Sequence, residues 1–161
     1  MTTIKSDYIT PLFCWDIYST QRFFQNDLNR KRQDISILKD LQARHQWNME
    51  VEGLLEQSYD ALVLTGKDIT IEWVNEGFHT MTGYSLKEVK GKNPNLLQGE
   101  ETTQLSVENV KHSLEDSGSF SQDIINYRKS GERYLCRIEV FPLLDKNQNI
   151  THYLAMETEI R

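Results

Sequence analysis

Three glutamates near the C-terminus come closest to the residue types and spacing that acid–base chemistry needs. Glu139, Glu157 and Glu159 lie in two segments in which apolar and polar residues alternate. Two carboxylates act as general acid and base only when both face one reacting group, usually beside a nucleophile or a histidine. The alternation separates these side chains, and no nucleophile or histidine joins them. The sequence therefore predicts a protein that is not an enzyme.

The cysteines and histidines do not have the spacing of metal ligands. Cys14 and Cys136 lie far apart and neither belongs to a CxxC motif, so we expect reduced thiols rather than a disulfide or a zinc site. The histidines at positions 45, 79, 112 and 152 form no i, i+4 pair. We interpret His45 as an ordinary residue of a packing interface, and we expect no structural metal.

The length of 161 residues fits one domain of about 100–120 residues plus an extension. A net charge of −6 argues against nucleic acid as a partner, and the basic residues 30–32 are interpreted as a solvated helix face. No apolar run approaches the roughly 20 residues that span a bilayer. The N-terminus lacks the apolar core of a signal peptide. We therefore expect a cytoplasmic protein without membrane contact.

Residues 1–50 are predicted to form a helical extension ahead of a domain at 51–161. Two helices are expected, from about Ile17 to Leu28 and from about Asp34 to Gln57, because the composition favours helix. Gln42 and His45 interrupt the apolar stripe of the second helix, which argues for an amphipathic helix that docks rather than for a coiled coil. No Gly, Pro or Ser linker follows, so this helix is expected to run directly into the domain.

The domain is predicted to begin with a β-hairpin and two short helical segments. Residues 61–65 and 69–75 are the strands, with Ile69, Ile71 and Trp73 on one face. Residues 76–82 form a short helix that ends at Gly83, and Ser85 with residue 88 has the spacing of a capping box. A longer helix is expected over residues 102–116.

Three strands, at residues 120–127, 133–142 and 150–160, are predicted to complete the domain. The order of elements predicts an α+β fold, with a five-stranded antiparallel sheet and helices on one face. Alternation places Tyr134 and Cys136 on one face and Leu135 and Phe141 on the other. Both faces carry apolar side chains, so both need cover. The short helices cover one, and the N-terminal helix or a second subunit covers the other.

A homodimer is therefore predicted. Its candidate interface residues come from the extension and from the sheet face that the short helices do not cover. They are Ile35, Leu38, Leu41, Leu54, Leu135, Phe141, Leu154 and Met156.

Residues 73–102, WVNEGFHTMTGYSLKEVKGKNPNLLQGEET, resemble a PAS sensory domain, and more narrowly its light-oxygen-voltage (LOV) branch. The later segments IINYRKSGERYLCRIEVFPLLD and HYLAMETEI are similar to the closing strands of that family in order and spacing. The resemblance covers residues 50–161, about two thirds of the chain. It implies the PAS fold and a sensory role.

The resemblance also implies differences in the flavin-binding loop. In LOV domains the matching loop carries a reactive cysteine between an asparagine and an arginine, and a glutamine further on. Asn93 and Gln98 match two amides that contact flavin. Pro94 stands at the cysteine position and Asn95 at the arginine position. The resemblance therefore implies that no cysteinyl–flavin adduct forms and that the charged phosphate contact is missing.

Two of three further flavin-contacting positions also differ. Asn126 matches the first of two family asparagines, Cys136 replaces the second, and Glu157 replaces the glutamine of the last strand. A buried carboxylate that faces flavin carbonyls needs a proton or a cation. We expect no cofactor, with flavin mononucleotide (FMN) as the alternative.

The candidate ligand-binding residues are thus Asn93, Gln98, Asn126, Cys136 and Glu157. They form either a polar cavity for a small cationic or hydrogen-bonding metabolite or a filled core in which they satisfy one another. Haem-binding members of the family use a histidine on the long helix. His112 lies about 200° around that helix from Val110 and Leu114, so we expect it to face solvent.

The prediction is a non-enzymatic PAS module that dimerises and transmits a ligand or partner signal through its N-terminal helices. Three kinds of function remain open: a ligand-free interaction module, a small-metabolite sensor, and a flavin-binding LOV-like protein without adduct chemistry. The resemblance implies an effector partner such as a histidine kinase, either in trans or in a longer parent chain.

Overall fold

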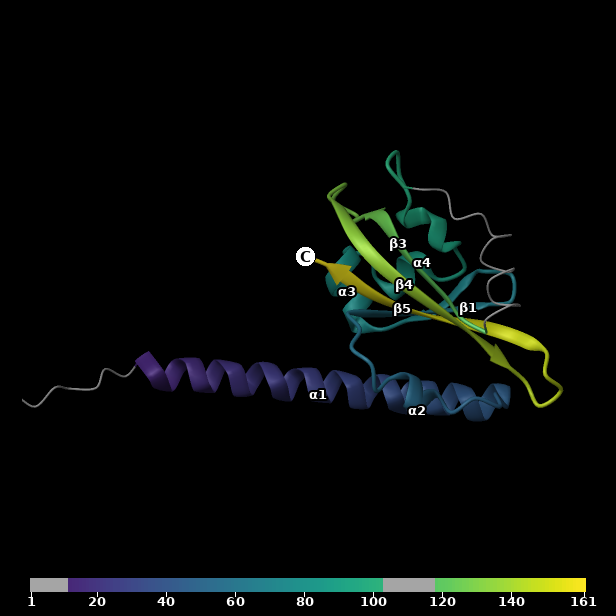
Figure 1. Cartoon of the computed structure of the whole chain (residues 1–161), viewed down its shortest axis with the longest axis horizontal. Helices are drawn as coiled ribbons and strands as arrows, with labels where there is room; N and C mark the ends of the chain where they lie inside the picture. The colour runs from purple at the N-terminus through teal and green to yellow at the C-terminus, as the bar shows by residue number, and fades with distance from the viewer. Residues whose placement is uncertain (1–11, 103–117) are drawn as a thin grey trace, which may run out of the picture.

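The computed structural model describes residues 12–102 and 118–161. Its architecture is a five-stranded antiparallel sheet with short helices on one face and a long N-terminal helix on the other (Figure 1). The predicted α+β fold is confirmed. The predicted helix over 102–116, with His112, lies outside the described residues.

The N-terminal extension is one helix, α1 (Leu12–His45), and not two. Neither glycine nor proline occurs within it, so no residue breaks the backbone hydrogen bonding. The helix ends at His45, and Gln46 takes a left-handed conformation with φ 55°. The chain then doubles back along α1. This reversal brings Gln57 beside the middle of the helix, where Lys31 Nζ donates a hydrogen bond of 3.3 Å to the carbonyl of Gln57. The predictions of a helix to Gln57 and of a direct run into the domain were wrong.

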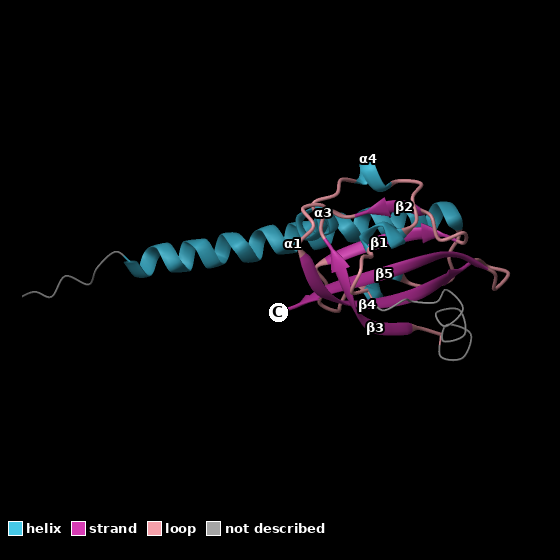
Figure 2. Ribbon diagram, turned by 90° about the horizontal axis from the view of Figure 1, so that it is seen from above, coloured by secondary structure: helices cyan, strands magenta, loops and turns pink. Residues whose placement is uncertain are grey.

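The reversal forms a short second helix, α2 (Val51–Leu54), beside the C-terminal half of α1. An ion pair between Lys39 and Glu52 joins the two helices. The N-terminal half of α1 extends beyond the domain (Figures 1 and 2). There, residues 19–22 and 25–30 are exposed. No helix in the described part of the chain is long and apolar enough to cross a membrane.

The sheet has the strand order β2–β1–β5–β4–β3, so the last strand of the chain lies at its centre. All neighbouring strands are antiparallel. The strands are β1 (Ala61–Gly66), β2 (Ile71–Val74), β3 (Phe120–Tyr127), β4 (Arg133–Leu144) and β5 (Ile150–Ile160).

A β-bulge in β2 corrects the predicted hairpin. Leu64 pairs with Trp73, but the next residue of β1 pairs with Ile71, so Glu72 is the extra residue. Ile71 therefore packs with the short helices while Trp73 packs on the opposite side of the sheet. Ile69 belongs to the turn, with φ 63°. The prediction that Ile69, Ile71 and Trp73 share one face was wrong.

The short helices are α3 (Glu76–Thr82), α4 (Leu86–Val89) and the 3₁₀ helix Pro94–Leu97. The predicted helix stop is confirmed, because Gly83 adopts φ 78° and its N–H bonds the carbonyl of His79. The predicted capping box at Ser85 is also confirmed.

The sheet separates two apolar cores. On the face that we call inner, sheet residues pack against α3, α4 and the 3₁₀ helix, and this core includes Ala61, Val63, Phe78, Met81, Val89, Leu97, Tyr134 and Cys136. On the outer face, sheet residues pack against α1 and α2, and this core includes Leu38, Trp47, Val51, Leu55, Leu62, Leu64, Leu143, Leu154 and Met156. The helical extension thus covers the second face.

Candidate functional site

The inner face of the sheet carries a buried polar set, which we define as Asn126, Tyr134, Cys136 and Glu157. Asn126 on β3 stands opposite Tyr134 on β4, and Glu157 on β5 stands opposite Ile138. Side chains that stand opposite each other in an antiparallel pair project from the same face. The set therefore lies along one side of three adjacent strands. Its members are almost fully buried, with Glu157 only 4% exposed.

Three atoms of the buried polar set have no hydrogen-bond partner in the described part of the chain. They are Asn126 Oδ1, the Tyr134 hydroxyl and Glu157 Oε2. A buried polar atom left unpaired costs about 1–3 kcal/mol, so folded proteins rarely leave several together. The alternative in which these groups satisfy one another stays a prediction.

Burial controls the protonation of this set. It raises the pKa of Glu157 to about 7, because the ionised carboxylate has lost its water. Burial, and then the neighbouring charge of Glu157, raise the pKa of the Tyr134 hydroxyl and of the Cys136 thiol. The thiol donates to the carbonyl of Arg137 at 3.6 Å. Cys136 is therefore a protonated, unreactive core residue.

The loop residues of the predicted site are less buried. Asn93 is exposed, and its side-chain oxygen accepts from the N–H of Asn95 at 2.9 Å as the cap of the 3₁₀ helix. Gln98 is half-buried at the other end of that helix. The structure thus gathers Asn126, Cys136 and Glu157, whereas the amide oxygen of Asn93 already has a partner.

This loop is nevertheless held against β3. The Thr102 hydroxyl donates to the carbonyl of Ile125 at 2.6 Å, and the N–H of Glu101 donates to the Tyr127 hydroxyl at 3.2 Å. A Cβ on Gly99 would lie 2.4 Å from the Tyr127 ring, so only glycine permits this approach. The loop is therefore packed against the C-terminal end of β3.

Seven of the eight predicted interface residues pack in the outer core between the sheet and the helices. Leu135 is the exception, with 40% of its surface exposed. A role for these residues between two subunits stays a prediction.

A second polar cluster, which sequence reasoning missed, ties α1 to the start of α3. Asn75 Oδ1 accepts from the N–H groups of Leu62 at 2.9 Å and Phe78 at 3.0 Å. Its Nδ2 donates to Asp34 Oδ2 at 2.9 Å, and the Tyr59 hydroxyl donates to the same carboxylate at 3.2 Å. Burial raises the pKa of Asp34. Asp34 and Tyr59 lie far from Asn75 in the chain, so only Asn75, as the residue that caps α3, has a local sequence signal.

Asn75→Ala is expected to lower the free energy of unfolding by about 2 kcal/mol or more. The change removes a helix cap, worth about 0.5–2 kcal/mol, and leaves the Leu62 N–H and the Asp34 carboxylate buried without this partner. Urea denaturation measures the loss. The exposed Asn95→Ala serves as control, and equal stabilities of the two variants would contradict the assigned role.

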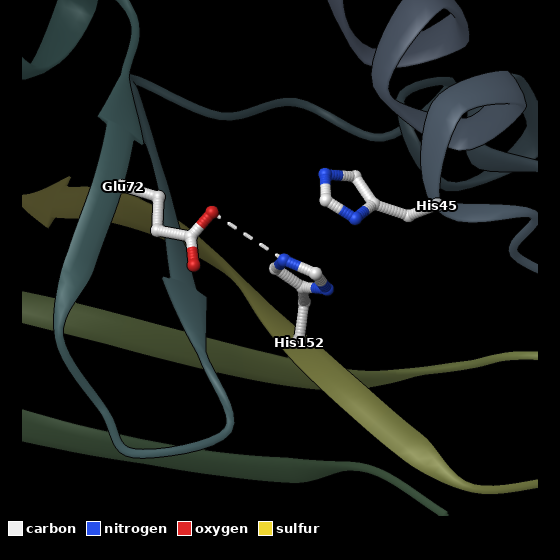
Figure 3. Close-up of side chains that lie close together, drawn as sticks. All are labelled: His45, Glu72 and His152. Carbon is white, nitrogen blue, oxygen red and sulfur yellow. Dashed lines mark ion pairs between the residues drawn. The ribbon is translucent and has the colours of Figure 1, made fainter.

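A third cluster joins α1, β2 and β5. His45 is the last residue of α1, Glu72 is the bulge residue of β2, and His152 lies on β5 (Figure 3). His152 Nε2 lies 3.4 Å from Glu72 Oε2, and the ring centroids of His45 and His152 are 4.3 Å apart. Burial lowers the pKa of His152, although Glu72 opposes this. Sequence reasoning missed the cluster because its members come from three separate elements.

The comparisons with known proteins identify the class of domain. The family model for the PAS domain matches residues 60–161, which is more than half of the chain. The chain belongs to the PAS domain family. The boundary that was predicted at residue 51 stays a prediction.

Relatives in sequence include photoreceptors. Phototropin-2 of Oryza sativa is 34% identical over 106 residues, which cover 66% of this chain and 12% of that protein. A blue-light-activated histidine kinase of Brucella anthropi is 36% identical over 93 residues, covering 58% and 19%. A nitrogen fixation regulatory protein of Klebsiella oxytoca is 32% identical over 107 residues, covering 66% and 22%. The chain thus spans less than a quarter of these relatives.

Solved structures agree with this class. The dark structure of the Aureochrome1 LOV photoreceptor has a TM-score of 0.62 at 26% identity, covering 71% of this chain and 85% of that one. The LOV domain of a blue-light-activated histidine kinase from Erythrobacter litoralis has a TM-score of 0.56 at 27% identity, covering 65% and 98%. The resemblance to LOV domains is confirmed. The matched region is a sensory domain similar to those of light-sensing signalling proteins.

Proposed function

We propose that this chain is a sensory module that binds a small molecule against its inner sheet face and transmits binding to α1. One observation carries the proposal: β5 contributes side chains both to the buried polar set on the inner face and to the outer core. Glu157 points to the inner face, while Leu154 and Met156 lie in the outer core with α1 and α2. A ligand that moves Glu157 therefore moves a strand on which the helices pack.

The unpaired atoms of the buried polar set define the ligand chemistry. The Asn126 oxygen accepts a hydrogen bond, and the Tyr134 hydroxyl can donate or accept one. Glu157 donates when protonated and accepts when ionised, and its pKa of about 7 makes both states accessible near neutrality. A small molecule with hydrogen-bond donors, neutral or cationic, satisfies these requirements.

The projecting half of α1 is the proposed output. Most of the stability of a helix in a protein comes from packing of its apolar face, and residues 25–30 of this half are exposed. Leu28, with 47% exposure, offers an apolar contact there. We propose that this segment pairs with a second copy of the chain and acts on an effector. Histidine kinases among the relatives indicate one class of effector.

FMN is a second candidate ligand. A structure titled as a flavin-analogue study of a LOV domain is 30% identical, with a TM-score of 0.61. Asn126, Gln98 and a protonated Glu157 offer hydrogen bonds that suit a flavin ring. Pro94 supplies no thiol and Asn95 no positive charge, so any binding would be non-covalent and weak at the phosphate.

Native mass spectrometry and absorption spectroscopy of the freshly purified full chain test the proposal. We expect added mass of one small molecule per chain, lost in Asn126→Ala and retained in the exposed control Asn147→Ala. A blue-light absorption band in the released ligand would identify a flavin. A bare polypeptide mass in wild-type protein, together with no binding of added FMN, would favour a ligand-free interaction module instead.

A further inference from the structure

We propose that His45, Glu72 and His152 form a binding site for a zinc ion. One potential ligand atom from each of the three side chains lies within 4.8 Å of the other two. Figure 3 shows all three side chains directed toward one another from separate elements. The inference does not depend on a ligand at the inner face, because these residues belong to the opposite side of the molecule.

Ligand type selects the metal. Two imidazole nitrogens and one carboxylate oxygen suit zinc, which keeps a fourth position for water in sites with three protein ligands. Magnesium and calcium prefer sites made of oxygen alone, so they fit this set poorly. The ligand atoms of a tetrahedral zinc site lie about 3.3 Å apart. His152 and Glu72, at 3.4 Å, already meet that spacing.

The third ligand requires only side-chain movement. His45 is half-buried at the end of α1, and the Glu72 side chain is 45% exposed, so both can rotate. Both also line a groove of about 540 Å³ with Asp40, Arg44 and Lys90. The fixed charges of these three sum to +1, and the carboxylate of Glu72 brings the groove to neutrality while it lies in direct contact with the ion.

The surroundings of His152 orient it for this role. Its Nδ1 lies 3.0 Å from the Thr151 hydroxyl, which bonds the carbonyl of Leu143 at 3.2 Å. Trp47 Nε1 donates to the Thr151 hydroxyl at 3.0 Å and to His152 Nδ1 at 3.3 Å. While Nδ1 accepts from Trp47, the ring proton is on Nε2 and faces Glu72. Zinc binding at Nε2 therefore requires that this proton is lost or moves to Nδ1, where the Thr151 hydroxyl can accept a hydrogen bond from it. Fixed partners of this kind orient the rings of metal-binding histidines.

A bound ion would fasten the end of α1 to β2 and β5. The bulge matters here, because Glu72 is the extra residue that faces His152. Zinc would therefore stabilise the docked helix and restrict the element that we propose as output.

Calorimetric titration of the chelator-treated full chain with Zn²⁺ tests the site. We expect one ion per chain and a higher thermal unfolding midpoint when Zn²⁺ is present. Loss of a residue that only hydrogen-bonds a metal ligand costs about 10- to 100-fold in metal affinity. His45→Ala and Glu72→Gln each change a ligand itself, so each should weaken Zn²⁺ binding at least about 100-fold. Co²⁺, used as a spectroscopic probe, should give the strong visible absorption of tetrahedral coordination.

Matched controls separate this site from other histidines and glutamates. His79→Ala and Glu76→Gln change exposed residues of α3 and should bind Zn²⁺ like wild type. Circular dichroism without metal shows whether each variant is folded. The proposal is overturned if wild-type protein shows no saturable binding, or if His45→Ala and Glu72→Gln bind as tightly as the controls.

Discussion

Leu38→Ala is expected to lower the free energy of unfolding by about 3 to 5 kcal/mol. Leu38 has no exposed surface and packs in the outer core between α1 and the sheet. Truncation removes the burial of its apolar atoms and leaves a cavity that rigid neighbours fill incompletely. Urea denaturation followed by circular dichroism measures the change. Because Leu38 is the most buried apolar residue of α1 among those whose burial the structure describes, the loss should also release the helix from the sheet.

Leu28→Ala is the matched control on the same helix. Leu28 is 47% exposed and lies on the projecting half of α1, so its change should alter stability by no more than about 0.5 kcal/mol. Hydrogen exchange should show faster exchange in residues 31–45 of Leu38→Ala only. Equal effects of the two substitutions would mean that α1 is not docked on the sheet.

Glu157→Gln is expected to stabilise the ligand-free protein by about 3 kcal/mol above pH 7 and to flatten its dependence on pH. Burial raises the pKa of Glu157 from 4.5 to about 7. Each pKa unit corresponds to 1.36 kcal/mol between the two protonation states, which gives a difference of about 3 kcal/mol. Glutamine has nearly the same shape and never ionises.

The sign follows from the two states of the chain. Below about pH 4.5 Glu157 is protonated in both the folded and the unfolded chain, and its burial carries no ionisation penalty. Between about pH 4.5 and 7 the unfolded chain loses the proton first, so wild-type stability falls as pH rises. Above about pH 7 both states are ionised and the penalty is complete.

Denaturation curves from pH 4 to 8, for wild type and Glu157→Gln, measure this difference. Glu56→Gln, at an exposed position, is the control and should follow wild type. If the difference between Glu157→Gln and wild type were independent of pH, Glu157 would not be a buried titrating group.

Local patterns were sufficient for much of the fold. Capping at Ser85, the left-handed Gly83 and the alternation in β4 and β5 depend on residues that are close in sequence, and the structure confirms each of them. In β5, Leu154 and Met156 lie in the outer core while Glu157 faces the inner side, as strand alternation requires. Together with the resemblance to PAS domains, these patterns led to the correct fold class.

Other features depend on contacts between distant segments. No pattern near Gln46 indicated that α1 would end and the chain double back, and the bulge that redirects Glu72 arises from its pairing with β1. A one-residue offset in a strand moves the following side chains to the opposite face, so a local pattern cannot predict it.

The candidate sites divide in the same way. The sequence by itself, through alternation and resemblance, determined that Asn126, Cys136 and Glu157 belong to one polar group. Only the tertiary structure decided that their neighbours leave polar atoms unpaired, and that His45, Glu72 and His152 meet. The physical reason is that strand alternation is a local property of the backbone, whereas the meeting of a helix end, a bulge and a central strand depends on how the whole chain packs.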